Sequence, residues 1–139
     1  MNDDTATRLR RILGECKTIA VVGLSSEPAR PSHGVARYLQ AHGYRVIPVN
    51  PRYERVLGER SYARLEDIDE PVHMVDVFRR GEEVGPVADG AIAIGAKCLW
   101  LQLGVFNEEA AAKARAAGLE VVVDRCVKID HALLMGRGA

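Results

Sequence analysis

The hydrophobic positions of this chain alternate between short continuous runs and longer segments with helical spacing. The continuous runs predict buried strands at residues 19–22, 45–49, 72–78, 98–103 and 120–123. The spaced segments predict helices at residues 4–15, 33–42, 82–94, 107–118 and 129–135. We expect Gly14 to end the first helix and Ser32 to cap the second. Residues 51–72 between the second and third strands carry no such pattern and predict an irregular connection.

Short strands alternating with helices are typical of an α/β fold. The pattern predicts a Rossmann-like, doubly wound, mostly parallel five-stranded sheet with helices on both faces. Right-handed crossovers favour the strand order 3-2-1-4-5. The 139 residues suit a single domain, 1–139.

Composition and charge narrow the classes of partner. The formal net charge is zero, so no long-range field attracts nucleic acid or an anionic membrane, and we expect neither partner. No apolar run has the length of a membrane span, and the acidic N-terminus lacks an apolar signal core. Cys16, Cys98 and Cys126 form no CxxC pair, which argues against a disulfide framework or a zinc site and favours a reducing, cytoplasmic location.

In such a sheet, ligands bind beyond the carboxyl ends of the strands, so five segments should converge. They are residues 23–32, 50–53, 77–80, 102–106 and 124–128. The first follows the run Thr18–Val22, where Gly23 permits a tight turn into a helix start. The hydroxyl groups of Ser25 and Ser26 suit a phosphate or ribose there, although Ser25 replaces the second Gly of a dinucleotide fingerprint. The alternative is an ordinary turn between strand and helix.

The second segment discriminates between nucleotides. NAD-binding domains place an acidic residue at the end of the second strand to bind the ribose hydroxyls. Here Asn50, Pro51 and Arg52 occupy that end, and no acid occurs before Glu54. An arginine favours a phosphate on the ribose, as in NADP or the 3′-phospho-ADP of coenzyme A. The alternative is a solvated surface arginine.

The ends of the third and fourth strands carry aromatic, charged and polar residues. Phe78 has the shape to pack on an adenine or a pantetheine arm, with Arg79 or Arg80 near phosphates, or it lies in the core with both arginines in water. Gln102 and Gly104 end the fourth strand, where Gly104 permits either close backbone approach or a turn.

No combination of residues predicts catalysis. Cys126 lies between Arg125 and Lys128, with His131 five residues on, so a reactive thiolate and an inert cysteine both remain open. His33, beside the phosphate loop, either binds ligand or lies on the surface. The four histidines form no metal-ligand pattern, and we expect no metal.

Five motifs in order resemble one family. They are Ile-Ala-Val-Val-Gly-Leu-Ser, Val-Ile-Pro-Val-Asn-Pro, Val-Asp-Val-Phe-Arg-Arg, Trp-Leu-Gln-Leu-Gly-Val and Asp-Arg-Cys-Val-Lys, spread over residues 14–136. They resemble the small stand-alone CoA-binding proteins, which are similar to the CoA-binding domain of the succinyl-CoA synthetase α subunit. The synthetases carry a phosphohistidine on a later domain that has no counterpart here, so ligase activity does not carry over.

The resemblance implies a binding site for coenzyme A or an acyl-CoA, held through its 3′-phospho-ADP moiety. It places residues 23–26 at the diphosphate, residues 50–52 around the 3′-phosphate and residues 77–79 on the facing wall. Two alternatives remain: an NADP-binding oxidoreductase or NAD(P)-sensing module, and a subunit whose protein partner supplies catalysis. The residues expected at the ligand are Gly23, Leu24, Ser25, Ser26, Arg30, His33, Asn50, Pro51, Arg52, Val77, Phe78, Arg79, Gln102 and Gly104.

Overall fold

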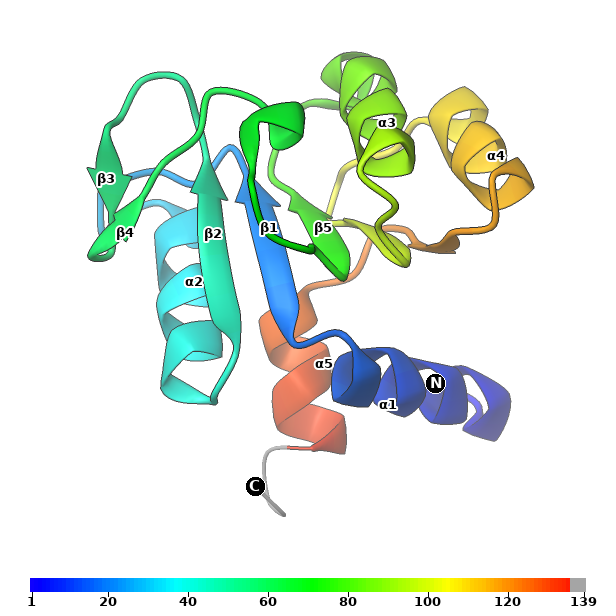
Figure 1. The fold of residues 1–139 in the computed structure, drawn as a ribbon. Coiled ribbons are helices and arrows are strands. Elements are labelled where there is room, and N and C mark those ends of the chain that lie inside the picture. Colours follow the sequence, from blue (N-terminus) through cyan, green and yellow to red (C-terminus); the bar gives the residue numbers. More distant parts are fainter. Residues whose placement is uncertain (136–139) are drawn as a thin grey trace.

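A parallel five-stranded sheet forms the centre of the protein (Figure 1), and the computed structural model describes residues 1–135. The sheet strands are β1 (Thr18–Val22), β2 (Arg45–Val49), β5 (Met74–Val77), β6 (Cys98–Leu101) and β7 (Glu120–Val122). The helices are α1 (Asp3–Glu15), α2 (Pro31–Ala41), α3 (Val84–Ala93), α4 (Glu108–Ala116) and α5 (Val127–Leu134). The predicted Rossmann-like α/β class with helices on both faces is confirmed.

The predicted strand order 3-2-1-4-5 is wrong in the place of the third sheet strand. The observed order is β2-β1-β5-β6-β7, so β5 pairs with β1 rather than with β2. The connection from β2 crosses the face that carries α3, where Leu65 joins the core beneath that helix. A right-handed crossover on that face brings the chain back past β1.

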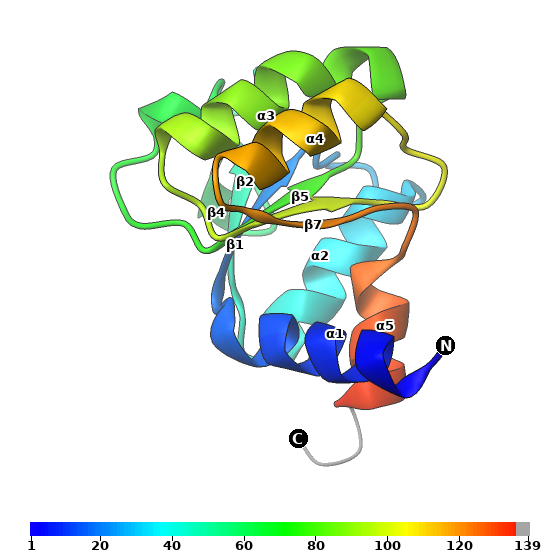
Figure 2. The ribbon, with the colours of Figure 1, turned by 90° about the vertical axis from the view of Figure 1, so that its right-hand side faces the viewer.

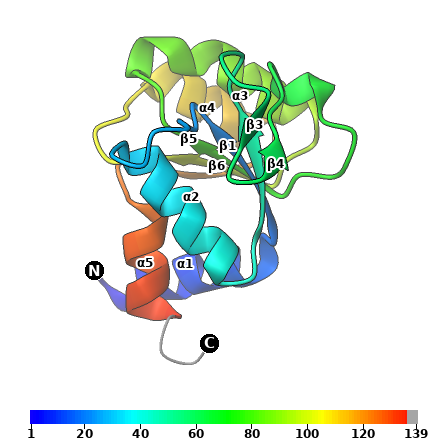
Figure 3. The ribbon, with the colours of Figure 1, turned by 90° about the vertical axis from the view of Figure 1, so that its left-hand side faces the viewer.

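Strand β2 is consequently an edge strand, and a small hairpin covers its end (Figure 3). The hairpin consists of β3 (Arg55–Val56) and β4 (Glu59–Arg60), so the connection predicted to be irregular contains two short strands. Beyond β4, the Tyr62 N–H donates to the Pro48 carbonyl at 3.0 Å, and the Asn50 N–H donates to the Tyr62 carbonyl at 2.9 Å. These bonds fix the end of β2, where the cleft described below begins.

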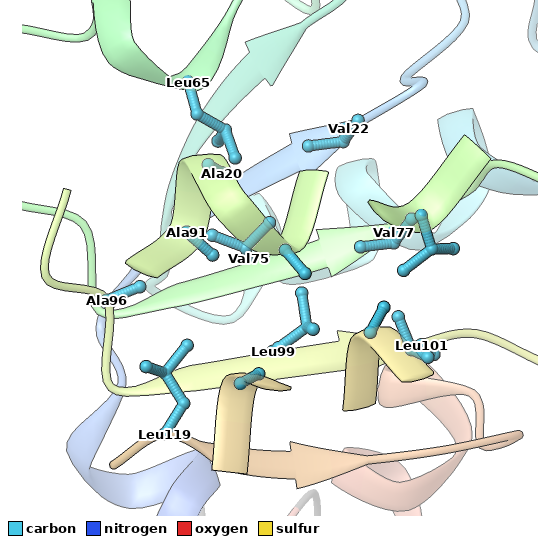
Figure 4. Close-up of a cluster of buried hydrophobic side chains, with 14 of the residues drawn as sticks. Ala20, Val22, Leu65, Val75, Val77, Ala91, Ala96, Leu99, Leu101 and Leu119 are labelled. Carbon is cyan, nitrogen blue, oxygen red and sulfur yellow. The ribbon is translucent and has the colours of Figure 1, made fainter. Parts of the chain in front are cut away.

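The sheet separates two layers of helices (Figure 2). Helices α3 and α4 cover one face, and α1, α2 and α5 cover the other. Side chains alternate along each strand: Val75 and Val77 face α3 and α4, whereas Met74 faces the other layer. Figure 4 shows the first of these cores, in which Val75, Leu99 and Leu101 pack against Ala91 and its neighbours.

Two residues predicted to delimit helices take other positions in the structure. Gly14 lies inside α1, which ends one residue later. Helix α2 begins at Pro31 with Arg30 at the N-cap, and the Ser32 hydroxyl instead accepts a hydrogen bond from the Ser25 N–H at 3.0 Å. Within residues 1–135, no helix has both the length and the apolar character needed to cross a membrane.

Candidate functional site

A cleft of about 660 Å³ lies at the carboxyl ends of the sheet strands, and all five predicted segments contribute to it. Its lining residues are Gly23, Ser25, Glu27, Arg30, Pro31, Ser32, Val35, Asn50, Arg52, Tyr53, Phe78, Arg79, Arg80, Glu83, Gln102, Leu103, Gly104, Val105 and Cys126. The convergence follows from the parallel sheet, which brings every strand end to one edge.

Nine of the fourteen predicted ligand residues line this cleft, namely Gly23, Ser25, Arg30, Asn50, Arg52, Phe78, Arg79, Gln102 and Gly104. The other five do not. Leu24 and Val77 are fully buried in the core, and Pro51 lines a neighbouring cavity of about 330 Å³. Ser26 and His33 flank the cleft in sequence without lining it. Arg79 lines both cavities, so the two adjoin.

The loop after β1 is held by hydrogen bonds that aim its backbone toward the cleft. Gly23 has a φ of +87°, and its N–H donates to the Val49 carbonyl at 2.9 Å. The buried Asn50 amide donates to the Leu24 carbonyl at 3.1 Å, and Asn50 Oδ1 accepts from the Arg52 N–H at 3.0 Å. Asn50 therefore ties the ends of β1 and β2 together and is a structural member of the site as well as a lining residue.

The start of α2 faces the same cleft. Its N-cap residue Arg30 makes no side-chain capping bond, so first-turn N–H groups lack that partner. A helix start in this position attracts anions through its unpaired N–H groups and its dipole. Arg30 and Arg52 add positive charge beside it.

Tyr53 also lines this end of the cleft; it belongs to the predicted segment 50–53 but was not among the residues expected at the ligand. It follows Arg52 directly, in the turn after β2. Hydrogen bonding from the hydroxyl of Ser25, and then that of Ser26, lowers the pKa of the Tyr53 phenol. In the sequence, its position three residues after Asn50, at the end of the second strand, was the available indication that it lies near the ligand edge of the sheet.

Beyond β1, the cleft is lined by Arg79, Arg80 and Glu83 after β5 and by uncharged residues after β6. Phe78 is half-buried: it packs against the core and also lines the cleft, so both alternatives for its position hold in part. Gly104 turns with a φ of +78°, and its N–H donates to Asp124 Oδ1 at 2.8 Å. Gln102 is buried at the floor, and its amide donates to Asp76 Oδ1 at 2.8 Å. The Asp76–Gln102 pair was not singled out from the sequence.

The cations beside Cys126 have other partners. Arg125 forms a two-point ion pair with the buried Asp130, at 2.6 and 3.0 Å. The Lys128 ammonium lies over the Tyr38 ring, 5.5 Å from its centroid. His131 Nδ1 is 2.8 Å from the Tyr38 hydroxyl, and burial lowers the pKa of His131. The structure thus shows none of the three directed at the thiol.

Cys126 is nevertheless the accessible cysteine. It lines the cleft, whereas Cys16 and Cys98 are buried. Burial raises the pKa of Cys16 to about 11 and that of Cys98 well above its usual value, which suppresses their thiolates.

We expect iodoacetamide to alkylate Cys126 in the native protein at least tenfold faster than Cys16 or Cys98, because the thiolate of an exposed cysteine is the reacting species. Peptide mass spectrometry after timed labelling measures this order. Labelling in urea, where all three residues should react, is the control. Equal native rates at Cys98 and Cys126 would contradict the described burial.

Comparison with known proteins places the chain in a family. The family model described as "CoA binding domain" matches residues 17–132. The uncharacterized protein YneT of Bacillus subtilis is 40% identical over 133 residues, which cover 96% of this chain and 98% of that protein.

Two solved structures agree with this assignment. A hypothetical protein from Pyrococcus horikoshii superposes with a TM-score of 0.93 at 41% identity, covering 94% of this chain and 92% of that one. A protein from Thermus thermophilus gives a TM-score of 0.90 at 40% identity, covering 97% and 100% of the two chains. Family match, sequence identity and fold therefore agree: the chain belongs to the CoA-binding domain family.

Proposed function

We propose that the cleft binds coenzyme A or an acyl-CoA, with the 3′-phospho-ADP moiety at the ends of β1 and β2. The observation that carries the proposal is the position of Arg52, which lines the same cleft as the Ser25 loop and the start of α2. The acidic lining residues, Glu27 and Glu83, come from other segments, so no carboxylate at the end of β2 is available for a free ribose diol.

The distribution of charge along the cleft gives the ligand a direction. Arg30, Arg52 and the helix start, which has no side-chain cap, lie near β1 and β2 and favour phosphates. Arg79 and Arg80 extend the positive charge to the end of β5, the strand beside β1. Gln102, Leu103 and Val105 follow β6, two strands beyond β1 in the sheet, about 10 Å away at ordinary strand spacing. An anionic nucleotide with a long uncharged arm matches this layout, and the pantetheine arm of coenzyme A has that character.

We further propose that the protein holds its ligand without transforming it, as a carrier or sensor, with any chemistry supplied by a partner protein. The support is the pairing around Cys126: Arg125 and His131 are engaged by Asp130 and Tyr38, so neither is available as its activating group. Within residues 1–135, no three His, Cys, Asp or Glu residues gather to hold a metal ion.

The proposal predicts that Arg52→Ala weakens coenzyme A binding about 10- to 100-fold, since a charge-assisted hydrogen bond contributes about 1.5–3 kcal/mol. Its effect on 3′-dephospho-CoA should be less than about threefold, because that ligand lacks the phosphate. Isothermal titration calorimetry on both ligands measures the difference. Arg10→Ala, on the exposed face of α1, matches the loss of charge and should leave both affinities unchanged.

NADPH is the third ligand in the same titration. It carries a ribose phosphate but not the pantetheine arm, so we expect weaker binding than that of coenzyme A. Equal affinity of the wild-type protein for coenzyme A and 3′-dephospho-CoA would remove the role of Arg52. Binding of NADPH alone would replace the proposal with the NADP alternative.

A further inference from the structure

The floor of the cleft contains a buried carboxyl group that the proposed function does not use. Asp76 lies in the middle of the sheet, on β5, and is fully buried. Its Oδ1 accepts the 2.8 Å hydrogen bond from Gln102 Nε2. Its Oδ2 is the one enclosed side-chain oxygen or nitrogen without a partner in residues 1–135. Burying a carboxyl group with one unpaired oxygen destabilises the fold, so a role in the site would explain why Asp76 is there.

Gln102 connects this carboxyl group to the cleft. Its residue is only 4% exposed, and it lines the cleft. Its Oε1 makes no hydrogen bond within the described residues, and it is not among the enclosed unpaired atoms. The amide therefore points its N–H₂ group at Asp76 and leaves its carbonyl oxygen accessible from the cleft.

We propose that Asp76 is a positioning residue that fixes the Gln102 amide so that its carbonyl oxygen accepts a hydrogen bond from an N–H group on the uncharged arm of the ligand. This inference rests on the proposed function, because the amide N–H groups of a pantetheine arm are the donors it would select. An ionised carboxylate only accepts hydrogen bonds, so it holds the N–H₂ group of the amide inward. The ligand then meets an acceptor and not a donor.

Protonation of Asp76 would reverse this selection. A protonated carboxyl group gains an O–H donor and keeps one acceptor oxygen. When that O–H donates to the Gln102 carbonyl oxygen, the amide turns and its N–H₂ group faces the cleft. Burial raises the pKa of Asp76 to about 7, against the opposing effect of the Gln102 hydrogen bond. The Gln102 group that faces the cleft should therefore change from the carbonyl oxygen to the N–H₂ group as the pH falls through about 7.

The surroundings of Asp76 contain few groups that would titrate with it. Its register neighbours, Val21 on β1 and Trp100 on β6, do not ionise, and the buried Cys98 on β6 has a raised pKa and stays neutral. Helix α2 contributes apolar Val35 and Ala36 to this core.

Two titratable groups of α5 also lie in this layer. Asp130 and His131 are buried there, but they pair with Arg125 and Tyr38. The lining of the cleft adds further charged or titratable side chains, namely Glu27, Arg30, Arg52, Tyr53, Arg79, Arg80, Glu83 and Cys126.

The direct test is the titration of the Asp76 carboxyl group by ¹³C NMR, with and without saturating coenzyme A. Because one net hydrogen bond contributes about 1 kcal/mol, we expect coenzyme A to lower the pKa of Asp76 by about 0.5 to 1. By linkage, affinity should be about two- to fivefold higher at pH 8 than at pH 6. The Asp76→Asn variant, which cannot titrate, corrects for protonation of the ligand phosphates and should lose this difference.

Gln102→Met tests the acceptor itself with little change in volume. Coenzyme A should bind about fivefold more weakly at pH 8, and adenosine 3′,5′-bisphosphate, which lacks the arm, should bind as to wild type. Gln40→Met, at the far end of α2, is the matched control. If coenzyme A binds but neither variant nor pH alters its preference over the bisphosphate, the inference is overturned. If neither ligand binds, the proposed function itself fails.

Discussion

Asp76→Asn should stabilise the folded protein at pH 8 by up to about 4 kcal/mol while changing its stability little at pH 4. Burial raises the pKa of Asp76 to about 7, from an ordinary value of 3.8. Between these two values the folded state keeps a proton that the unfolded state has released. The contribution of Asp76 to stability is therefore fully present below about pH 4, and it is lost as the pH rises to about 7. A tenfold change in proton affinity between the unfolded and folded states is equivalent to about 1.4 kcal/mol of stability.

Urea denaturation of both proteins at pH values from 4.5 to 8.5 measures this difference. The gain from the substitution should grow with pH and reach a plateau above about pH 7.5. Subtracting the wild-type curve cancels the other titrating groups, which both proteins share. Asp67→Asn, at an exposed carboxylate paired with Arg64 at 3.6 Å, is the control and should change the curve by less than about 1 kcal/mol at every pH. A constant difference for Asp76→Asn would contradict the raised pKa.

A stabilising substitution in the floor of the cleft also bears on function. Protein sites that bind or react often retain groups that destabilise the fold. If Asp76→Asn gains stability and loses the pH-dependent selection of ligand, the carboxyl group is kept for binding rather than for folding.

Gly23→Ala should destabilise the protein by about 3 kcal/mol or more and abolish ligand binding. Gly23 has a φ of +87°, and a Cβ atom there would lie 2.2 Å from the Phe78 carbonyl oxygen. The backbone cannot shift easily, because Gly23 bonds to Val49 on one side and Phe78 bonds to Val22 on the other, both at 2.9 Å. The close approach and the left-handed backbone both penalise a side chain.

Gly43→Ala separates these two effects. Gly43 has nearly the same φ, +88°, but nothing lies within 4 Å of its added Cβ atom. That variant should lose only about 1 kcal/mol, the cost of the backbone conformation alone. Chemical denaturation of both variants gives the comparison, and calorimetry with coenzyme A gives the binding. Equal losses for the two would show that the approach to Phe78 is not rigid.

The sequence alone determined the fold class and most of the predicted residues that line the cleft, because both depend on local patterns. Period and run length identified the strands, and the rule that parallel strand ends share one edge gathered residues as distant as Gly23 and Gln102. The predicted strand order was wrong, although the sequence contains a residue that argues against it. Pro48 lies within β2 and lacks an N–H donor, so it favours an edge strand. The order 3-2-1-4-5 would have placed β2 inside the sheet.

Only the tertiary structure decided which residues near a strand end face the cleft. Leu24 and Val77 were expected at the ligand but are buried in the core. Val77 faces the α3 and α4 layer because alternate residues of a strand face opposite layers, and Leu24, in the loop after β1, packs into the other layer. The bond between Asp76 and Gln102 joins residues 26 apart in the chain, and its burial raises the pKa of a carboxyl group that the sequence shows only as one polar residue in a strand. Pairing across strands and exclusion of water are properties of the assembled sheet, so the chemistry of this floor became visible only there.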